Sequence, residues 1–305
     1  MASDPAFRPL TGLYEPSAIQ QLPDGRFLVV EDEERHPFSL LTIAPDGSVA
    51  AAPLRPGLLE SFRSFWKLND LEGLALDRSG QLYAVTSHSR DGDGNEKTDR
   101  NKLVRFRIEG DHVVDTGVVH GLKPALMAAH PVLKQAAAVA DGKSGQGFNI
   151  EALETIADGQ QLLVGFRSPI VGQRAVVAVI ENPAAMFDAG EPPRIGATLL
   201  TLDLDGGGIR AMAWVASLNG YLVSSGSAIR KQEPFRLWFW SGDAQAPAKR
   251  VTVAGLEGFA HAEGVSPAVI NGREHIIVVS DDGDRSTNRP AQYLLLDPGQ
   301  LQIAG

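Results

Sequence analysis

The fold of this chain is decided by the stretch Glu72-Gly-Leu-Ala-Leu-Asp-Arg-Ser-Gly-Gln-Leu-Tyr-Ala-Val-Thr-Ser87. Apolar strand residues flank the turn dipeptide Ser79-Gly80, so the stretch predicts a β-hairpin. The same pattern occurs five times in the chain, and the first strands of the five copies begin at Glu15, Glu72, Glu151, Arg210 and Glu263. Repeats of this size, built of strands without a periodic helix, indicate a solenoid or a propeller.

Each repeat continues beyond its hairpin. Third strands are expected over residues 37–44, 102–108, 175–180, 235–240 and 292–296, and fourth strands over residues 48–54, 112–119, 196–202 and 249–253. Short strands at even spacing, separated by Gly, Pro and Asn, are typical of propeller blades. We therefore predict an all-β propeller with five blades, and six blades is the alternative count.

The N-terminal residues are expected to close the ring. The fifth repeat stops after its third strand, and residues 8–13 can supply the missing outer strand, which removes a sheet edge. Residues 124–140 predict a helical insertion near residues 121–148, and residues 61–68 favour a second short helix. Since no compositional break divides the chain, we expect residues 1–305 to form a single propeller domain.

The composition excludes several classes of partner and site. The chain has 305 residues, a formal net charge of −9 and no cysteine. The charge argues against nucleic acid and anionic membranes as partners, because phosphate binding leaves a basic footprint. The missing cysteines exclude disulfides, thiolate catalysis and zinc–thiolate sites. Neither a signal peptide nor a membrane span is visible, so the cytoplasm is expected, or the periplasm if a leader was removed.

The repeat places charged side chains at one mouth of the central channel. The leading residues of the first strands are expected to form a ring of Glu15, Glu72, Glu151, Arg210 and Glu263. Carboxylates held together in a low-dielectric funnel repel one another unless a cation or an arginine lies among them. The alternative role of the glutamates is structural, since each could accept backbone N–H groups from a neighbouring blade.

Residues that follow the second strands are expected at the same mouth. Together they give an acidic side on blades five, one and two and a basic side on blades three and four, which suits a hard cation and an anionic ligand group. We assign metal binding to Glu15, Asp32, Glu263 and Asp281, and catalytic roles to Glu72, His88, Arg167 and Arg210. The expected cofactor is calcium or magnesium, and the expected ligand is a small anionic molecule.

The turn Asp91-Gly-Asp93-Gly-Asn95 has the alternating oxygen ligands that open a calcium loop. It departs from the EF-hand because Glu96 replaces the required Gly and Lys102 replaces the final Glu. Asp91 and Asp93 are therefore candidate metal ligands, with a solvated acidic turn as the alternative. No serine-hydrolase elbow or zinc-protease motif is present.

Several motifs resemble two families of bacterial propellers. The stretch from Glu72 to Ser87 resembles proteins labelled "esterase-like activity of phytase", and that resemblance implies calcium and ester or phosphate-ester hydrolysis. The segments Asn149-Ile-Glu-Ala-Leu-Glu154, His261-Ala-Glu-Gly-Val265 and Val279-Ser-Asp-Asp282 resemble the family called domain of unknown function 3616. The second resemblance covers nearly the whole chain. Neither family supplies a set of catalytic residues, and a shared fold does not assign a reaction.

Two functions follow as hypotheses. In the first, the chain is a metal-dependent hydrolase of a phosphate ester or another ester. A cation would polarise the ester oxygen, a carboxylate or His88 would activate water, and Arg167 or Arg210 would hold the anion. In the second, the propeller is not catalytic and binds a ligand or a protein partner beside a structural metal.

Overall fold

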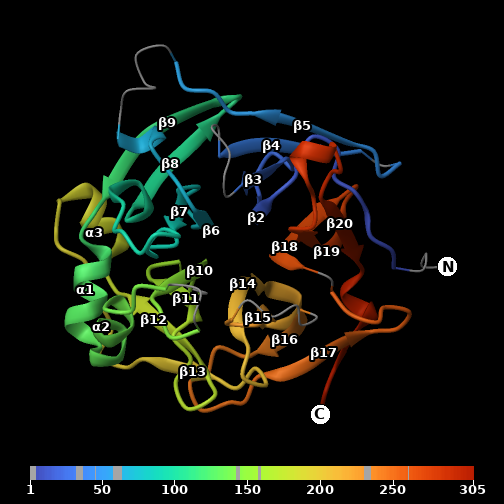
Figure 1. Ribbon diagram of the computed structural model, residues 1–305. Coiled ribbons are helices and arrows are strands. Elements are labelled where there is room, and N and C mark those ends of the chain that lie inside the picture. Colours follow the sequence, from blue (N-terminus) through green and yellow to red (C-terminus); the bar gives the residue numbers. More distant parts are fainter. Residues whose placement is uncertain are drawn as a thin grey trace.

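The computed structural model shows a five-bladed β-propeller (Figure 1). The structure describes residues 5–31, 37–44, 46–57, 64–141, 145–156, 159–229, 235–259 and 261–305. Within these residues the strands form five antiparallel sheets, and each sheet is one blade. The predicted blade count of five is confirmed.

The blades follow the chain in order. Blade one has β2 (Pro16–Gln21), β3 (Phe27–Glu31), β4 (Phe38–Ile43) and β5 (Val49–Pro53). Blade two has β6 (Leu71–Leu76), β7 (Leu82–Thr86), β8 (Leu103–Glu109) and β9 (His112–Val119). Blade three has β10 (Asn149–Thr155), β11 (Leu162–Ser168), β12 (Ala175–Ile180) and β13 (Leu200–Leu202).

The last two blades also take strands from the ends of the chain. Blade four has β14 (Gly208–Val215), β15 (Gly220–Gly226), β16 (Arg236–Trp240), β17 (Lys249–Val253) and β21 (Leu301–Ile303). Blade five has β18 (Ala262–Ile270), β19 (Arg273–Ser280), β20 (Gln292–Leu296) and β1 (Arg8–Pro9). The innermost strands are β2, β6, β10, β14 and β18, and each contacts the innermost strands of both neighbouring blades.

Both ends of the chain pair with strands that lie far away in the sequence. In β1, Arg8 pairs with Tyr293 of β20, so the predicted closure of blade five by the N-terminus is confirmed. In β21, Ile303 pairs with Val251 of β17, which gives blade four a fifth strand that the sequence did not predict. The ring is therefore closed by the first described strand, and the last strand widens the blade before it.

Among the described residues, three α-helices lie outside the five sheets. The predicted helical insertion contains α1 (Leu122–Ala129) and α2 (Pro131–Ala137), which lie on the outer side of blade three (Figure 1). The helix α3 (Pro183–Asp188) lies between β12 and β13, and it begins at Pro183, which suits the first turn of a helix because no backbone N–H is needed there. Single turns of 3₁₀ helix occur at Ser64–Trp66, Thr98–Arg100, Ala216–Leu218, Arg285–Thr287 and Pro298–Gln300. None of these helices is long and apolar enough to cross a membrane.

The hydrophobic core of the described residues consists of five clusters, one between each pair of neighbouring blades. Strand β16 shows how one strand serves two clusters. Leu237 faces the cluster between blades four and five, while Trp238 and Trp240 face the cluster between blades three and four. Since successive side chains point to opposite faces of a strand, a blade buried on both faces is apolar throughout. Both tryptophans therefore pack between blades three and four.

Candidate functional site

Each innermost strand carries a β-bulge near its start. In blade two, Leu71 pairs with Thr86 and Gly73 pairs with Val85, so Glu72 has no opposite residue. The equivalent register shifts in the five blades isolate Ser17, Glu72, Glu151, Arg210 and Glu263. A bulge redirects one side chain out of the sheet pattern and is common at the rims of closed sheets. The predicted ring is correct in four blades and wrong in blade one, where Glu15 lies two residues before the equivalent position, Ser17.

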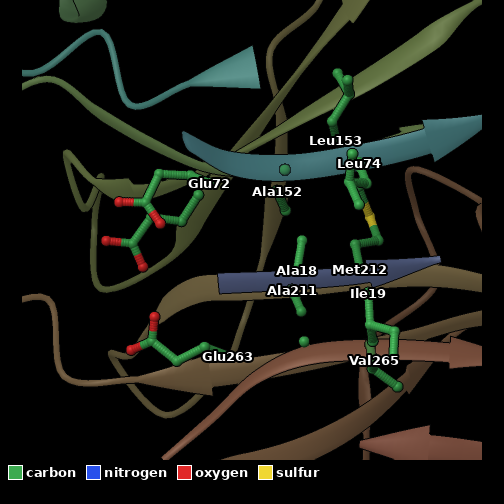
Figure 2. A pocket seen from close by; sticks show the side chains of 13 residues that line it. Ala18, Ile19, Glu72, Leu74, Ala152, Leu153, Ala211, Met212, Glu263 and Val265 are labelled. Carbon is green, nitrogen blue, oxygen red and sulfur yellow. The ribbon is translucent and has the colours of Figure 1, made fainter. Parts of the chain in front are cut away.

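Below the bulges the channel is closed by two layers of side chains. The first layer is small and consists of Ala18, Gly73, Ala152, Ala211 and Gly264, and the second is large and apolar and consists of Ile19, Leu74, Leu153, Met212 and Val265. Figure 2 shows Glu72 and Glu263 at one end and Leu74, Leu153 and Met212 at the other.

The small layer is required because the innermost strands lie very close together. A Cβ atom on Gly73 would lie 2.7 Å from the backbone nitrogen of Leu153. The free volume between the lining side chains is about 10 Å³, which is roughly the room that one water molecule needs. A ligand larger than a water molecule therefore does not fit between these layers of the channel.

Arg210 joins three blades at the mouth. Its Nη1 atom lies 3.0 Å from Oε2 of Glu151 in blade three and 2.9 Å from Oε1 of Glu263 in blade five. Its Nη2 donates to the carbonyl of Ser227, and the guanidinium lies 4.9 Å from the ring centre of Phe235. Burial lowers the pKa of Arg210, but the carboxylates of Glu151, Glu263 and Glu72 outweigh it and raise that pKa. The guanidinium of Arg210 thus supplies the positive charge that offsets the repulsion between the carboxylates of the ring.

Glu151 is the most enclosed carboxylate of the ring. It is 3 % exposed, and its Oε1 accepts from Asn149 Nδ2 at 2.9 Å and from Arg167 Nη1 at 3.1 Å. Among the described residues, the buried Oδ1 of Asn149 and Oγ of Ser168 lack hydrogen-bond partners. Asn149 and Ser168 face each other across β10 and β11. Arg167 and Arg210 are both paired with carboxylates, so their expected role of holding an anionic ligand stays a prediction.

The blade-five side of the mouth carries an excess of carboxyl groups. Asp281 follows β19, and its backbone N–H donates to the carbonyl of His261. Burial raises the pKa of Asp281 to about 7, and the neighbouring carboxylates of Glu263 and Glu15 add to the shift. Burial also raises the pKa of Glu263, although Arg210 opposes that change. The structure therefore brings Glu15, Glu263 and Asp281 together, and their expected role as metal ligands stays a prediction.

His88 does not face solvent. It is fully buried, has a positive φ of 55°, and its Nδ1 lies 2.8 Å from the carbonyl of Thr86. Burial lowers the pKa of His88 to about 4, so the ring is neutral at neutral pH. With the Nδ1 proton directed to that carbonyl, the buried Nε2 is an acceptor without a partner among the described residues. Its expected role as a general base stays a prediction.

Blade two contains a polar cluster that the repeat pattern did not reveal. Asp70 is buried, adopts a positive φ of 62°, and accepts hydrogen bonds from Ser87 and Ser89. Arg100 pairs with Asp70 at 2.9 Å and donates to Ser89. Non-glycine residues at positive φ are uncommon and are often held by local side-chain bonds. Asp70 lies before the repeated segment that begins at Glu72, so the repeat pattern does not include it. Only its contacts in the folded chain reveal its role.

The acidic turn at Asp91 is held by its own hydrogen bonds. Oδ1 of Asp91 accepts from the backbone nitrogens of Asp93 and Asn95, and Lys97 lies 3.1 Å from its other oxygen. These bonds and the lysine lower the pKa of Asp91 to about 2. Across the described ranges, no group of three or more His, Asp or Glu side chains is arranged to hold a metal ion. Asp32 lies outside the described residues.

The sequence matches the family described as "Protein of unknown function (DUF3616)" over residues 125–297, which is more than half of the chain. The chain belongs to the DUF3616 family. The match covers most of α1, all of α2 and the strands β10 to β20, so it includes Glu151, Arg210 and Glu263 of the ring. Comparison of this DUF3616 sequence with curated proteins found no match.

Solved structures similar to this DUF3616 chain include enzymes of several kinds. A proposed oxidoreductase (glucose dehydrogenase) from Thermus thermophilus is 17% identical, with a TM-score of 0.48 over 96% of this chain and 100% of that chain. The calcium structure of a Trichoderma reesei carbohydrate-active enzyme of family AA12 is 13% identical, with a TM-score of 0.47 over 97% and 87%. A proposed gluconolactonase is 11% identical, with a TM-score of 0.44 over 100% and 96%. Likeness at this level does not transfer an activity.

Proposed function

We propose that this DUF3616 propeller binds a small organic cation at the channel mouth, on the side formed by blade five. The observation that carries the proposal is the crowding of Glu15, Glu263 and Asp281, which together with burial raises the pKa of Asp281 to about 7. A carboxyl group with so high a pKa is destabilised in its ionised form, and a bound cation would relieve that destabilisation.

The channel mouth already holds one organic cation, the side chain of Arg210. The guanidinium of Arg210 lies between two carboxylates and over the ring of Phe235. Glu15 and Asp281 extend the same carboxylate surface beyond Arg210, and Asp281 is partly exposed. A ligand that carries an ammonium or guanidinium group is therefore the class that we propose.

Binding should release protons. The cation favours ionised Asp281, so it lowers the pKa of that group, and affinity should rise as the pH increases through about 7. The test is titration calorimetry with guanidinium chloride and putrescine at pH 6 and pH 8, in two buffers that differ in ionisation enthalpy. We expect tighter binding at pH 8 and a heat that depends on the buffer.

Two variants sharpen the test. Asp281→Asn should abolish the pH dependence and weaken binding, whereas Asp111→Asn, which changes a carboxylate with 80% side-chain exposure on another face, should leave both unchanged. Absence of binding by the wild type, or equal binding by Asp281→Asn, would refute the proposal.

A second candidate function is hydrolysis of an ester or phosphate ester at the same mouth. It is favoured by Asp281, because a partly exposed carboxyl group with a pKa near 7 suits a general base at neutral pH. Calcium or magnesium would have to be held by Glu15, Glu263 and Asp281 together with Asp32, since the described residues alone do not form a metal site. Turnover of nitrophenyl acetate and nitrophenyl phosphate, with and without each metal, tests this candidate.

A further inference from the structure

A groove with a basic lining lies where the ring closes, at the junction of blades five and one. It is on the face opposite the channel mouth, because the turn Asn271-Gly272 at the far end of β18 contributes to it. Its volume is about 380 Å³. Its apolar wall contains Ile43, Ile270 and Leu295, and its basic side chains are Arg8 on β1 and Arg273 and His275 on β19.

The basic side chains of this closure groove have no acidic partners among the described residues. The described lining contains no Asp or Glu, and no ion pair or side-chain hydrogen bond between described residues involves Arg8, Arg273 or His275. Two described carboxylates lie next to lining residues in the sequence, and each accepts a hydrogen bond from a serine. Asp46 accepts from Ser48, and Glu274 accepts from Ser217 of blade four. Within the part of the chain that the structure describes, the groove therefore concentrates basic side chains without a carboxylate partner, in a chain whose net charge is −9.

The repeat supplies an internal comparison. The equivalent groove between blades one and two has a volume of about 240 Å³ and combines the turn of one blade with the end of the third strand of the next, as the closure groove does. There Arg107 is accompanied by Asp24 and Glu109 in the lining. The basic lining of the closure groove thus differs from the mixed lining of the groove between blades one and two.

We propose that the closure groove binds the phosphate group of a small ligand. Two guanidinium groups and an imidazole offer donors from two strands of blade five, β1 and β19, and guanidinium donors match the oxygen geometry of phosphate. The net negative charge of the whole chain opposes approach to an anionic membrane, so a free phosphate group is favoured over a lipid headgroup.

The test uses the full chain and inorganic phosphate. Calorimetry and thermal melts are performed at constant ionic strength against sodium chloride, since exposed charges are screened by salt. We expect saturable binding and a rise in melting temperature with phosphate concentration. Arg8→Gln and Arg273→Gln should each weaken binding about tenfold or more, the factor that corresponds to loss of a hydrogen bond to a charged group.

The matched control is Arg107→Gln, which removes the arginine of the equivalent groove and should leave phosphate binding unchanged. Equal phosphate affinity in wild type, Arg8→Gln and Arg273→Gln would overturn the proposal, and so would a melting response that chloride reproduces. Co-sedimentation with vesicles containing phosphatidic acid, without binding of inorganic phosphate, would also overturn it in favour of a lipid headgroup. Circular dichroism of each variant establishes that the fold is retained.

Discussion

Replacement of Arg210 by methionine should reveal what the arginine contributes at the channel mouth. The substitution keeps much of the apolar side-chain volume but removes a charge that is only 7 % exposed. Two carboxylates would then lose their shared partner, Glu151 with a side-chain exposure of 3% and Glu263 with 14%. Loss of one member of a buried ion pair typically costs about 3–5 kcal/mol, so we expect a decrease of that size in the free energy of unfolding at pH 8.

The loss of unfolding free energy in Arg210→Met should depend on pH. The direction of that dependence follows from the pKa of Glu263. Burial already raises its pKa above the unfolded value, and Arg210 is the largest influence that lowers it. Without Arg210 the folded-state pKa rises further. A carboxyl group with a raised folded-state pKa favours the folded state at low pH, and this contribution disappears as the pH rises through that pKa. The deficit of Arg210→Met should therefore be largest at pH 8 and smaller at pH 5.

Urea denaturation followed by tryptophan fluorescence at both pH values measures the effect. Arg194→Met is the control, since Arg194 forms an exposed ion pair with Glu191 and should contribute at most about 1 kcal/mol. The reasoning would be refuted by a loss below about 1 kcal/mol for Arg210→Met at pH 8, or by equal losses at pH 5 and pH 8.

Three further substitutions give separate predictions. Burial raises the pKa of Glu154 to about 7, so the free energy of unfolding of the wild type should decrease by up to about 3 kcal/mol as the pH rises from about 4.5 through 7. Glu154→Gln should remove that decrease, which urea titrations would measure. Gly73→Ala places a Cβ atom against the next innermost strand and should lower stability by about 1–3 kcal/mol, whereas Gly92→Ala, which meets no atom within 4 Å, should change it little. Because the pKa of His88 is lowered, the free energy of unfolding of the wild type should decrease by up to about 3 kcal/mol as the pH falls from 6.5 through about 4. His88→Asn should abolish that decrease, which thermal melts across this pH range would measure.

The blade count and the N-terminal closure could be predicted from sequence because turn dipeptides and two-residue alternation leave a strong local signal. The position of Glu15 could not, because the bulged residue of blade one is Ser17, whereas the other four blades have a charged residue there, so an alignment on charged residues selected Glu15 two positions too early. The sequence placed Arg210 in the same ring as Glu151 and Glu263, but not its ion pairs with both, since side-chain contacts between blades leave no local signal. The short strand β21 gave no signal because its pairing partner lies some fifty residues earlier.

The positions of β1 and β21 determine when the ring can be completed during protein synthesis. Blades one to three are synthesised with all their own strands in sequence. In blade five, Arg8 is made first and cannot pair until Tyr293 has been synthesised. Blade four receives its last strand only when Leu301–Ile303 has been made. The strand β1 therefore stays without its sheet partner until β20 has been synthesised, and the ring cannot close before that point. Emergence of β20 from the ribosome should be the step that permits closure of the ring.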